Sequence, residues 1–210
     1  MSTLLVHYLP RGERSRTRRL VETAREAVPP EHLTEVDLVR APPPLLDDVL
    51  LPAYIRRNYL GETPDAREAA ALAPLDRHLD LLLRADTVIL AYPMFNFSVP
   101  ATVKAWMDAV MQKERTWTID DAGYRGLMNG RNALVLTTSG GQYTGGRAAW
   151  DHATPLVRHA FEFMGFEHIH VIAAEGMNSH PDQSEERLNR AAAETRHILD
   201  QWLVTETTYR

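Results

Sequence analysis

The chain has 210 residues, of which 44% are hydrophobic, and its formal net charge is −5 at pH 7. A chain of this size buries a sizeable core, so one globular domain is expected. The negative charge argues against nucleic-acid binding, and no apolar run of about 18 residues predicts a membrane span. Cysteine is absent, which excludes disulfides, thiolate catalysis and zinc–thiolate sites. No signal-peptide pattern is present, and we expect a cytoplasmic protein.

Apolar runs alternate with amphipathic segments at the start of the chain. Residues 4–8 form an apolar run that predicts a buried strand. Apolar residues at helical spacing then predict a helix over 15–27, which Pro29 and Pro30 end. A second strand is predicted over 33–38, and its more polar sequence is typical of the edge of a sheet.

Two less regular regions are expected in the middle of the chain. The first is an excursion packed over the domain near 40–74, with helical pieces near 46–50 and 66–72. The second, near 112–129, has strand-type residues followed by a turn signal, which predicts a hairpin or flap. The regular elements expected between them are a helix over 75–84, a strand over 86–92 and a helix over 101–111.

The remaining elements expected are a strand over 132–138, a helix over 149–164 stopped at Gly165, a strand over 168–174 and a helix over 184–204. Nearly continuous apolar strands that alternate with helices indicate a parallel sheet covered on both faces. Residues 1–210 are therefore predicted to form one α/β domain, a three-layer sandwich with a five-stranded parallel sheet. The flavodoxin-like strand order 2-1-3-4-5 fits, and it places a ligand crevice beside the first strand.

The loop over 9–17, after the first strand, has the features of an anion site. It enters a helix N-terminus, where free backbone N–H groups attract anions. Ser15 and Thr17 add hydroxyl donors, and three arginines in the loop add positive charge. The structural alternative is that Ser15 only caps the helix and that the arginines are solvated.

Two further loops reach the same edge of the predicted sheet. The loop over 93–98 offers the Asn96 amide and the flat rings of Phe95 and Phe97, which suit a planar ligand. The loop over 138–146 contains four glycines, which allow a ligand to approach the backbone closely. Taken alone, the rings are also consistent with core residues beneath a turn, and the glycines with a flexible surface loop. Together, the three loops predict a pocket for flavin mononucleotide (FMN).

Several segments resemble the FMN-dependent NADH-azoreductase family, a flavodoxin-like group of homodimeric quinone and azo-dye reductases. The strongest likeness is the segment 93–100 followed by Lys104 and Asp108, which is similar to the family's Pro-Met-Tyr-Asn-Phe segment. Supporting likenesses lie at 136–141, 163–166 and 174–176. The resemblance runs almost end to end, and it implies a homodimer; charge and the lack of a long apolar run are the grounds on which we expect no binding to nucleic acid or membrane.

The resemblance implies which residues would surround FMN and an electron acceptor. By family position, the isoalloxazine ring would contact Pro93, Met94, Phe95, Asn96 and Phe97. The polar edge of the ring would contact Thr138, Ser139, Gly140 and Gly141. The phosphate would be held by Ser15, Arg16 and Thr17. The substrate pocket would be lined by Phe95, Trp117, Tyr124 and Tyr143. Of these, Trp117 and Tyr124 lie on the flap and would reach the pocket from the partner subunit; the structural alternative is that they pack in the dimer contact or in the core.

Leu9 departs from the family pattern, because it stands where most members have a serine that binds the phosphate. A hydrogen bond to a charged group is worth about 1.5–3 kcal/mol, and Leu9 cannot form one. Arg11, Arg14 or Arg16 would have to offset the loss. We therefore include Leu9 in the cofactor site and predict weaker FMN retention than in typical relatives.

The activity that the resemblance implies is ping-pong exchange at one shared site. Hydride passes from NADH or NADPH to flavin N5, and a quinone or azo compound then accepts two electrons in the same place. The flavin carries this chemistry, so no side chain is assigned as a catalytic acid, a base or a metal ligand. Both donor nucleotides are consistent with the residues.

Two alternatives remain at the level of the sequence. The first is a flavodoxin-type electron carrier, although such carriers resemble one another in a shorter phosphate loop and a more acidic surface. The second is an azoreductase-like enzyme of specialised metabolism, with an altered substrate or with weak or absent flavin binding. Leu9 is the residue that motivates the second alternative.

Overall fold

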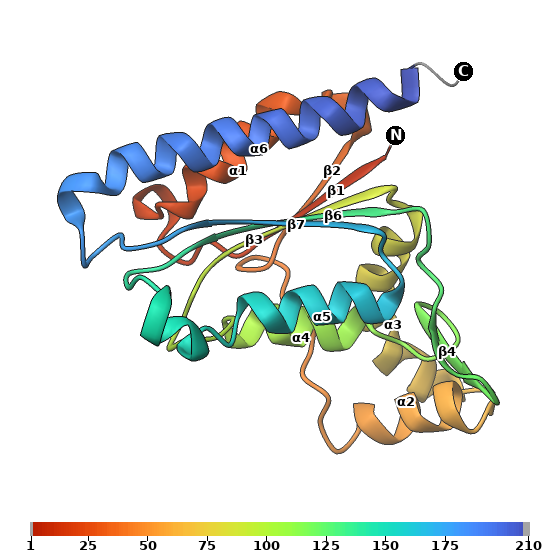
Figure 1. Cartoon of the computed structure of the whole chain (residues 1–210). Helices are drawn as coiled ribbons and strands as arrows, with labels where there is room; N and C mark the ends of the chain where they lie inside the picture. The colour runs from red at the N-terminus through yellow and green to blue at the C-terminus, as the bar shows by residue number, and fades with distance from the viewer. Residues whose placement is uncertain (1, 208–210) are drawn as a thin grey trace.

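The computed structural model describes residues 2–207, and its centre is a five-stranded parallel sheet (Figure 1). In chain order, the strands are β1 (Thr3–His7), β2 (Leu33–Asp37), β3 (Thr87–Pro93), β6 (Asn132–Thr138) and β7 (His168–Ala174). They lie side by side in the order β2-β1-β3-β6-β7, which confirms the predicted order 2-1-3-4-5. The inner strands are buried almost throughout, because both faces of the sheet are covered.

Helices cover the two faces of the sheet, which confirms the predicted fold class (Figure 1). One face carries α1 (Thr17–Ala27) and α6 (Ser184–Thr207), and the other carries α3 (Ala66–Arg84), α4 (Ala101–Val110) and α5 (Thr154–Met164). Side chains alternate along β1, so Leu4 and Val6 join the α3–α4–α5 cluster and Leu5 joins the α1–α6 cluster. None of the helices in the described chain combines the length and apolarity needed to cross a membrane.

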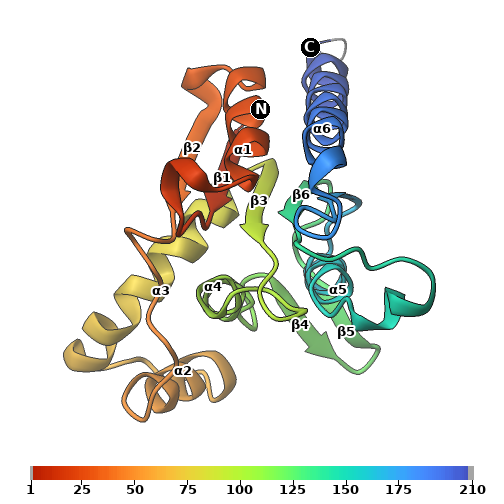
Figure 2. The same cartoon turned by 90° about the vertical axis from the view of Figure 1, so that its left-hand side faces the viewer.

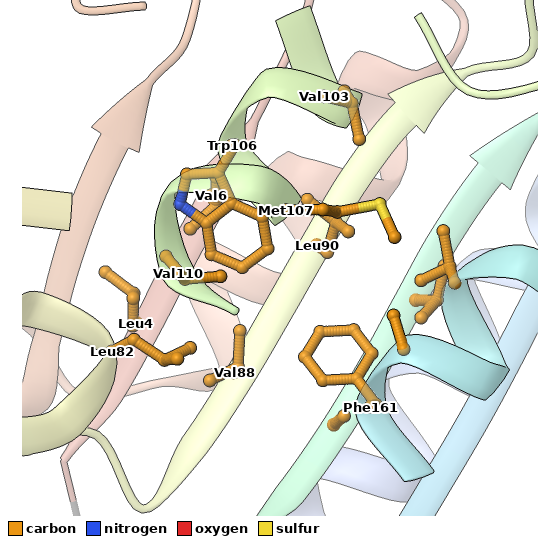
Figure 3. Packing of buried hydrophobic residues seen from close by; sticks show 14 of the residues in the cluster. Leu4, Val6, Leu82, Val88, Leu90, Val103, Trp106, Met107, Val110 and Phe161 are labelled. Carbon is orange, nitrogen blue, oxygen red and sulfur yellow. The ribbon is translucent and has the colours of Figure 1, made fainter. Parts of the chain in front are cut away.

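The larger apolar cluster lies between the sheet and helices α4 and α5 (Figure 3). Trp106 and Met107 of α4 join Val88 and Leu90 of β3 in this cluster, and Phe161 of α5 completes it. Trp106 is only 1% exposed, and full burial of a large apolar side chain stabilises a fold by about 1.5–3 kcal/mol. The cluster therefore holds the strands from which the site loops extend.

The excursion near 40–74 contains a helix that was predicted too early in the chain. Helix α2 (Leu50–Tyr59) begins where the predicted piece over 46–50 ends. The Asp47 carboxylate accepts hydrogen bonds from two backbone N–H groups at 3.0 and 2.8 Å, which caps the helix at this later position.

Helix α3 joins two pieces that were predicted as separate, over 66–72 and 75–84. Pro74 lies inside the continuous helix, although proline removes one backbone hydrogen bond there. A capping box formed by Asp65 and Glu68 starts the helix. Its buried face is formed by Leu72, Leu75, His78, Leu79 and Leu82. Burial of this face outweighs the effect of the proline.

Helix α5 begins at Thr154, later than predicted, and a 3-10 segment, η3 (Gly145–Trp150), precedes it. The Asp151 carboxylate accepts hydrogen bonds from the N–H groups of Ala153 and Thr154, both at 2.9 Å, and so sets the start of the helix. The helix ends at Gly165 as predicted, and this glycine has a left-handed φ of 95°.

A separate antiparallel hairpin forms within the region expected to be a flap, over 112–129. Its strands are β4 (Trp117–Asp120) and β5 (Gly123–Gly126). A Cβ atom at Gly126 would lie 2.3 Å from the Gly165 nitrogen, so the hairpin packs directly on the end of α5. In Figure 1 this end of the molecule is opposite the carboxyl ends of the sheet strands.

Candidate functional site

The loops that follow β1, β3 and β6 meet at the carboxyl edge of the sheet, which faces the viewer in Figure 2. A cavity of about 230 Å³ lies between them. The lining residues are Arg11, Ser15, Arg16, Pro93, Met94, Phe95, Thr138, Ser139, Gly140, Met177 and Asn178. The structure therefore brings three loops, separated by most of the chain, into one site.

Eight of the residues predicted around the cofactor line this cavity: Ser15, Arg16, Pro93, Met94, Phe95, Thr138, Ser139 and Gly140. Leu9, Thr17, Asn96, Phe97 and Gly141 do not line it. Thr17 is fully buried, and its hydroxyl is 2.7 Å from that of Thr138. This contact ties the loop after β1 to the loop after β6 and holds the two sides of the cavity together.

Leu9 lies on the other side of its loop. Its side chain packs against the α1–α6 apolar cluster, and it lines a neighbouring cavity together with His7 and Asp37. The structure thus places this residue away from the cavity that contains Ser15 and Arg16.

The loop after β1 supplies donors for an anion. The backbone N–H groups of Arg16 and Thr17 have no acceptor among residues 2–207, as expected in the first turn of a helix. Arg11 lines the same end of the cavity. The Arg16 guanidinium donates to the Met177 carbonyl and to the Asn178 side chain, so it bridges two walls of the site.

The sequence prediction missed a fourth loop at this edge, residues 175–179 after β7. The N–H groups of Gly176, Met177 and Asn178 donate to the carbonyls of the loop after β6 at 2.7, 2.9 and 3.0 Å. A Cβ atom at Gly140 would lie 2.6 Å from the Asn178 side-chain nitrogen, so a larger residue at this position would have to displace the Asn178 side chain. The signal that could have found residues 175–179 is their position, because they directly follow the carboxyl end of the fifth strand.

The turn after β3 has a constrained backbone that exposes two rings. Phe95 and Ser98 exchange two backbone hydrogen bonds of 2.9 Å, and the residues between them, Asn96 and Phe97, have left-handed φ values of 46° and 71°. This conformation costs about 1–2 kcal/mol for a residue such as phenylalanine. The rings of Phe95 and Phe97 are 43% and 46% exposed, so they are not core residues beneath the turn.

The four residues predicted to line the substrate pocket divide into two places. Phe95 lines the cavity. Tyr143 lies beside the cavity, because a Cβ atom added to Gly141, the neighbour of the lining residue Gly140, would be 3.2 Å from the Tyr143 hydroxyl. Trp117 and Tyr124 instead lie at the other end of the molecule, with ring centroids 5.2 and 5.5 Å from that of Phe163 in α5. Within one chain, the flap residues are not brought to the cavity.

Burial affects the ionisation of one carboxylate behind the glycine-rich loop. Burial raises the pKa of Glu175, and the nearby charge of Asp151 acts in the same direction. The Glu175 carboxylate accepts the backbone N–H of Tyr143 at 3.2 Å, which links the loops after β6 and β7 a second time. Among residues 2–207, no group of three or more histidine or acidic side chains is arranged to hold a metal ion.

Comparison with known proteins identifies the family. A model of the flavodoxin-like fold matches residues 1–199. The FMN-dependent NADH:quinone oxidoreductase 2 of Pseudomonas fluorescens (strain Pf0-1) is 36% identical over 199 residues, which cover 93% of this chain and 98% of the relative. The chain belongs to this family of flavodoxin-like quinone oxidoreductases. The resemblance read from the sequence is thereby confirmed.

Other members of the flavodoxin-like family agree with this assignment. The FMN-dependent NAD(P)H:quinone oxidoreductase 1 of Pseudomonas aeruginosa is 34% identical over 206 residues, covering 88% of this chain and 95% of the relative. Among solved structures, an azoreductase from Bacillus anthracis superposes with a TM-score of 0.85 at 23% identity, covering 96% of this chain and 100% of its own. An FMN-dependent NADH-azoreductase of the same species, in complex with FMN, has a TM-score of 0.83 at 22% identity and covers 96% and 99%. The structural likenesses show a shared fold.

Proposed function

We propose that the protein is an FMN-dependent oxidoreductase that passes hydride from NADH or NADPH to quinones or azo compounds. The observation that carries the proposal is the cavity at the carboxyl edge of the sheet. An anion-binding helix start, a ring-bearing turn and a glycine-containing wall meet there. The names of the relatives, which are FMN-dependent NADH:quinone and NAD(P)H:quinone oxidoreductases, support the same chemistry.

The donors around the cavity fit FMN at both ends. The free N–H groups of Arg16 and Thr17, with the Arg11 and Arg16 side chains, suit a phosphate. The exposed Phe95 ring and the Met94 side chain suit a planar ring. The Arg16 guanidinium pairs with Met177 and Asn178 through Nη1 only, so its Nε–H and Nη2 donors would be available for a phosphate.

The chemistry that bound FMN supplies is hydride exchange at N5, first with a nicotinamide and then with the acceptor. The chain's own residues orient the ring and stabilise charge. The backbone N–H groups of Gly140 and Gly141 have no acceptor among residues 2–207 and would donate to the pyrimidine edge, where negative charge develops on reduction. The loop after β1 would hold the phosphate, and no side chain is needed as an acid or a base.

Two experiments test the proposal. The first is an FMN titration followed by absorbance, and the second is oxidation of NADH or NADPH with menadione and with an azo dye as acceptors. We expect saturable FMN binding and turnover with both classes of acceptor. Failure to bind FMN would overturn the proposal and favour the flavin-free alternative. Reduction only through a partner reductase would instead favour the electron-carrier alternative.

Weaker FMN retention than in typical relatives remains part of this proposal. The prediction rests on the missing serine of the family pattern: Leu9 has no hydroxyl and is turned away from the cavity, so position 9 gives a phosphate no hydrogen bond, and such a bond to a charged group is worth about 1.5–3 kcal/mol. Dilution followed by gel filtration measures retention directly. Stoichiometric FMN that stays bound through this procedure would contradict the prediction.

We further propose that the protein is a homodimer. Helix α2 and the residues beside it expose an apolar patch formed by Leu45, Val49, Leu51, Ile55, Tyr59 and Leu60. The Tyr59 ring lies 6.4 Å from that of Trp117, so the patch continues onto the flap, where Tyr124 is 68% exposed. Contiguous apolar patches of this kind mark interaction sites. Sedimentation of wild type and of an Ile55→Asp variant tests this, and a monomeric wild type would contradict it.

The proposed reaction suggests a cytoplasmic location, because NADH and NADPH are regenerated there. Cell fractionation with an antibody against the native chain tests this location. Recovery of the protein outside the cytoplasmic fraction would contradict it.

A further inference from the structure

Three aromatic rings form a group beside the cavity, and one of them, Trp150, has no role in the proposed function. The Phe97 ring centroid lies 6.1 Å from that of Tyr143 and 5.9 Å from that of Trp150, with interplanar angles of 84° and 80°. Edge-to-face contacts of this kind are a favourable arrangement for aromatic rings. We refer to Phe97, Tyr143 and Trp150 as the aromatic wall.

The aromatic wall is fastened to the cavity by hydrogen bonds of the backbone. The N–H of His152, just after Trp150, donates to the Phe97 carbonyl at 2.8 Å. The N–H of Tyr143 donates to the Glu175 carboxylate at 3.2 Å. Phe95, two residues before Phe97, lines the cavity itself. The wall therefore has a defined position beside the predicted ring end of the cofactor site.

Burial in the core does not explain the aromatic wall. Trp150 is 52% exposed and Phe97 is 46% exposed, and η3, which carries Trp150, contributes no buried residue. Phe97 is moreover held in a left-handed conformation that phenylalanine disfavours. Strained, exposed aromatic residues beside a cavity are typical of a binding surface rather than of a structural contact.

We propose that the aromatic wall selects the acceptor, with Trp150 as its specificity-determining residue for planar, multi-ring compounds. This inference rests on the proposed function and adds the class of acceptor to it. An extended aromatic acceptor placed over the cavity beside Phe95 would pack a second ring against Phe97 and Trp150, whereas a single-ring acceptor has no second ring with which to make this contact. Tyr143 makes the second edge-to-face contact of the Phe97 ring.

Steady-state kinetics of the FMN-loaded Trp150→Ala variant tests the inference. We expect KM for a naphthoquinone to rise roughly five- to tenfold, the range that loss of one aromatic contact produces. KM for 1,4-benzoquinone should change less than about twofold, and the rate of flavin reduction by NADH should match that of wild type. Trp150→Phe should restore most of the discrimination, because it keeps a ring at this position.

The matched control is Arg147→Ala, which alters an exposed residue of the same η3 segment with no ring contact among residues 2–207. It should retain both KM values. A readout independent of turnover comes from calorimetry. The FMN-loaded wild type and Trp150→Ala are titrated with naphthalene-2-sulfonate, a redox-inert two-ring compound. We expect weaker binding to the variant.

The outcomes separate the two proposals. Equal changes in KM for one-ring and two-ring acceptors, or unchanged binding of the sulfonate, would overturn the role of Trp150 while leaving the proposed function standing. A wild-type protein that fails to bind FMN or to oxidise NADH would overturn the proposed function, and the aromatic wall would then have no acceptor to select.

Discussion

At the scale of single residues, Leu9 shows how the structure changes the meaning of a sequence departure. Family position places it at the phosphate, but its side chain packs against the α1–α6 cluster instead. The residues that face the cavity from this loop are Arg11, Ser15 and Arg16. In the proposed FMN site, phosphate binding would therefore depend on backbone N–H groups and arginines more than on the side chain at position 9.

The Leu9→Ser variant tests this view. We expect a loss of about 1–2 kcal/mol in the free energy of unfolding, because a half-buried apolar side chain is truncated. Affinity for FMN should change little, since the new hydroxyl would point away from the cavity. Urea denaturation and FMN titration provide the two measurements. Tighter FMN binding without loss of stability would show that position 9 does reach the phosphate.

Glu175 gives a prediction about pH, because burial raises its pKa above the ordinary value of 4.5. The folded chain then binds this proton more strongly than the unfolded chain does. The contribution of Glu175 to stability is greatest below 4.5 and declines as the pH rises through the raised pKa. Glu175→Gln keeps an oxygen for the Tyr143 N–H and removes the charge, so it should be more stable than wild type near neutral pH.

Urea denaturation between about pH 4 and pH 8 measures this difference, which should shrink toward acid. Glu35→Gln is the opposite case. A hydrogen bond from Arg25 lowers the pKa of Glu35, so its contribution is present above the ordinary pKa and is lost in acid. The Glu35 variant should be less stable than wild type at neutral pH. Profiles of both variants that run parallel to wild type would show that neither carboxylate acts in this way.

At the scale of elements, α3 shows that capping and burial together can override a helix-breaking residue. The carboxylate of Asp65 accepts the Glu68 N–H at 2.8 Å, and the Glu68 side chain accepts the Asp65 N–H at 3.0 Å. Leu72 and Leu75, on either side of Pro74, are 0% and 1% exposed. The helix therefore begins at a strong cap and continues because its apolar face is buried.

Removal of this cap by Asp65→Ala should lower the free energy of unfolding by about 1 kcal/mol. Asp48→Ala is the matched control, because Asp48 is an exposed aspartate in the same excursion that caps no helix. Its stability should stay within about 0.5 kcal/mol of wild type. Equal stability of the two variants in urea would mean that the capping box does not contribute to α3.

At the scale of the whole molecule, the site is assembled from four loops held by one rigid sheet. Residues from the loop after β1 line the same cavity as Met177 and Asn178, which follow the last strand. Binding of FMN should therefore stabilise the folded state as a unit. At a free FMN concentration of 100 times Kd, mass action predicts about 2.7 kcal/mol, or roughly 5–10 °C in Tm.

Thermal unfolding with increasing FMN measures this shift, and riboflavin is the control, because it has the same ring system without the phosphate. We expect riboflavin to raise Tm less than FMN does at equal concentration, because it has no phosphate to accept from the N–H donors of Arg16 and Thr17. If FMN and riboflavin stabilise the protein equally, the phosphate end of the cavity contributes nothing.

Local patterns in the sequence were sufficient for the five sheet strands, their order and the three principal loops. The reason is that a parallel α/β sheet repeats one local unit, and each unit ends at the same edge. The apolar runs of β1, β3 and β6 predicted buried strands, and Gly165 predicted the end of α5. Pattern alone failed at Pro74, where burial of neighbouring leucines decided the outcome.

The sequence by itself determined the fold class and the meeting of the loops after β1, β3 and β6 at one candidate site, because these follow from short-range periodicity, and it indicated the family through the resemblance of segments such as 93–100. Only the tertiary structure decided which side chains enter that site. It turned Leu9 toward the core, added Met177 and Asn178, separated the flap from the cavity within one chain and placed Trp150 beside Phe97. Contacts between distant segments depend on how layers pack, and no local pattern encodes the direction of a loop side chain.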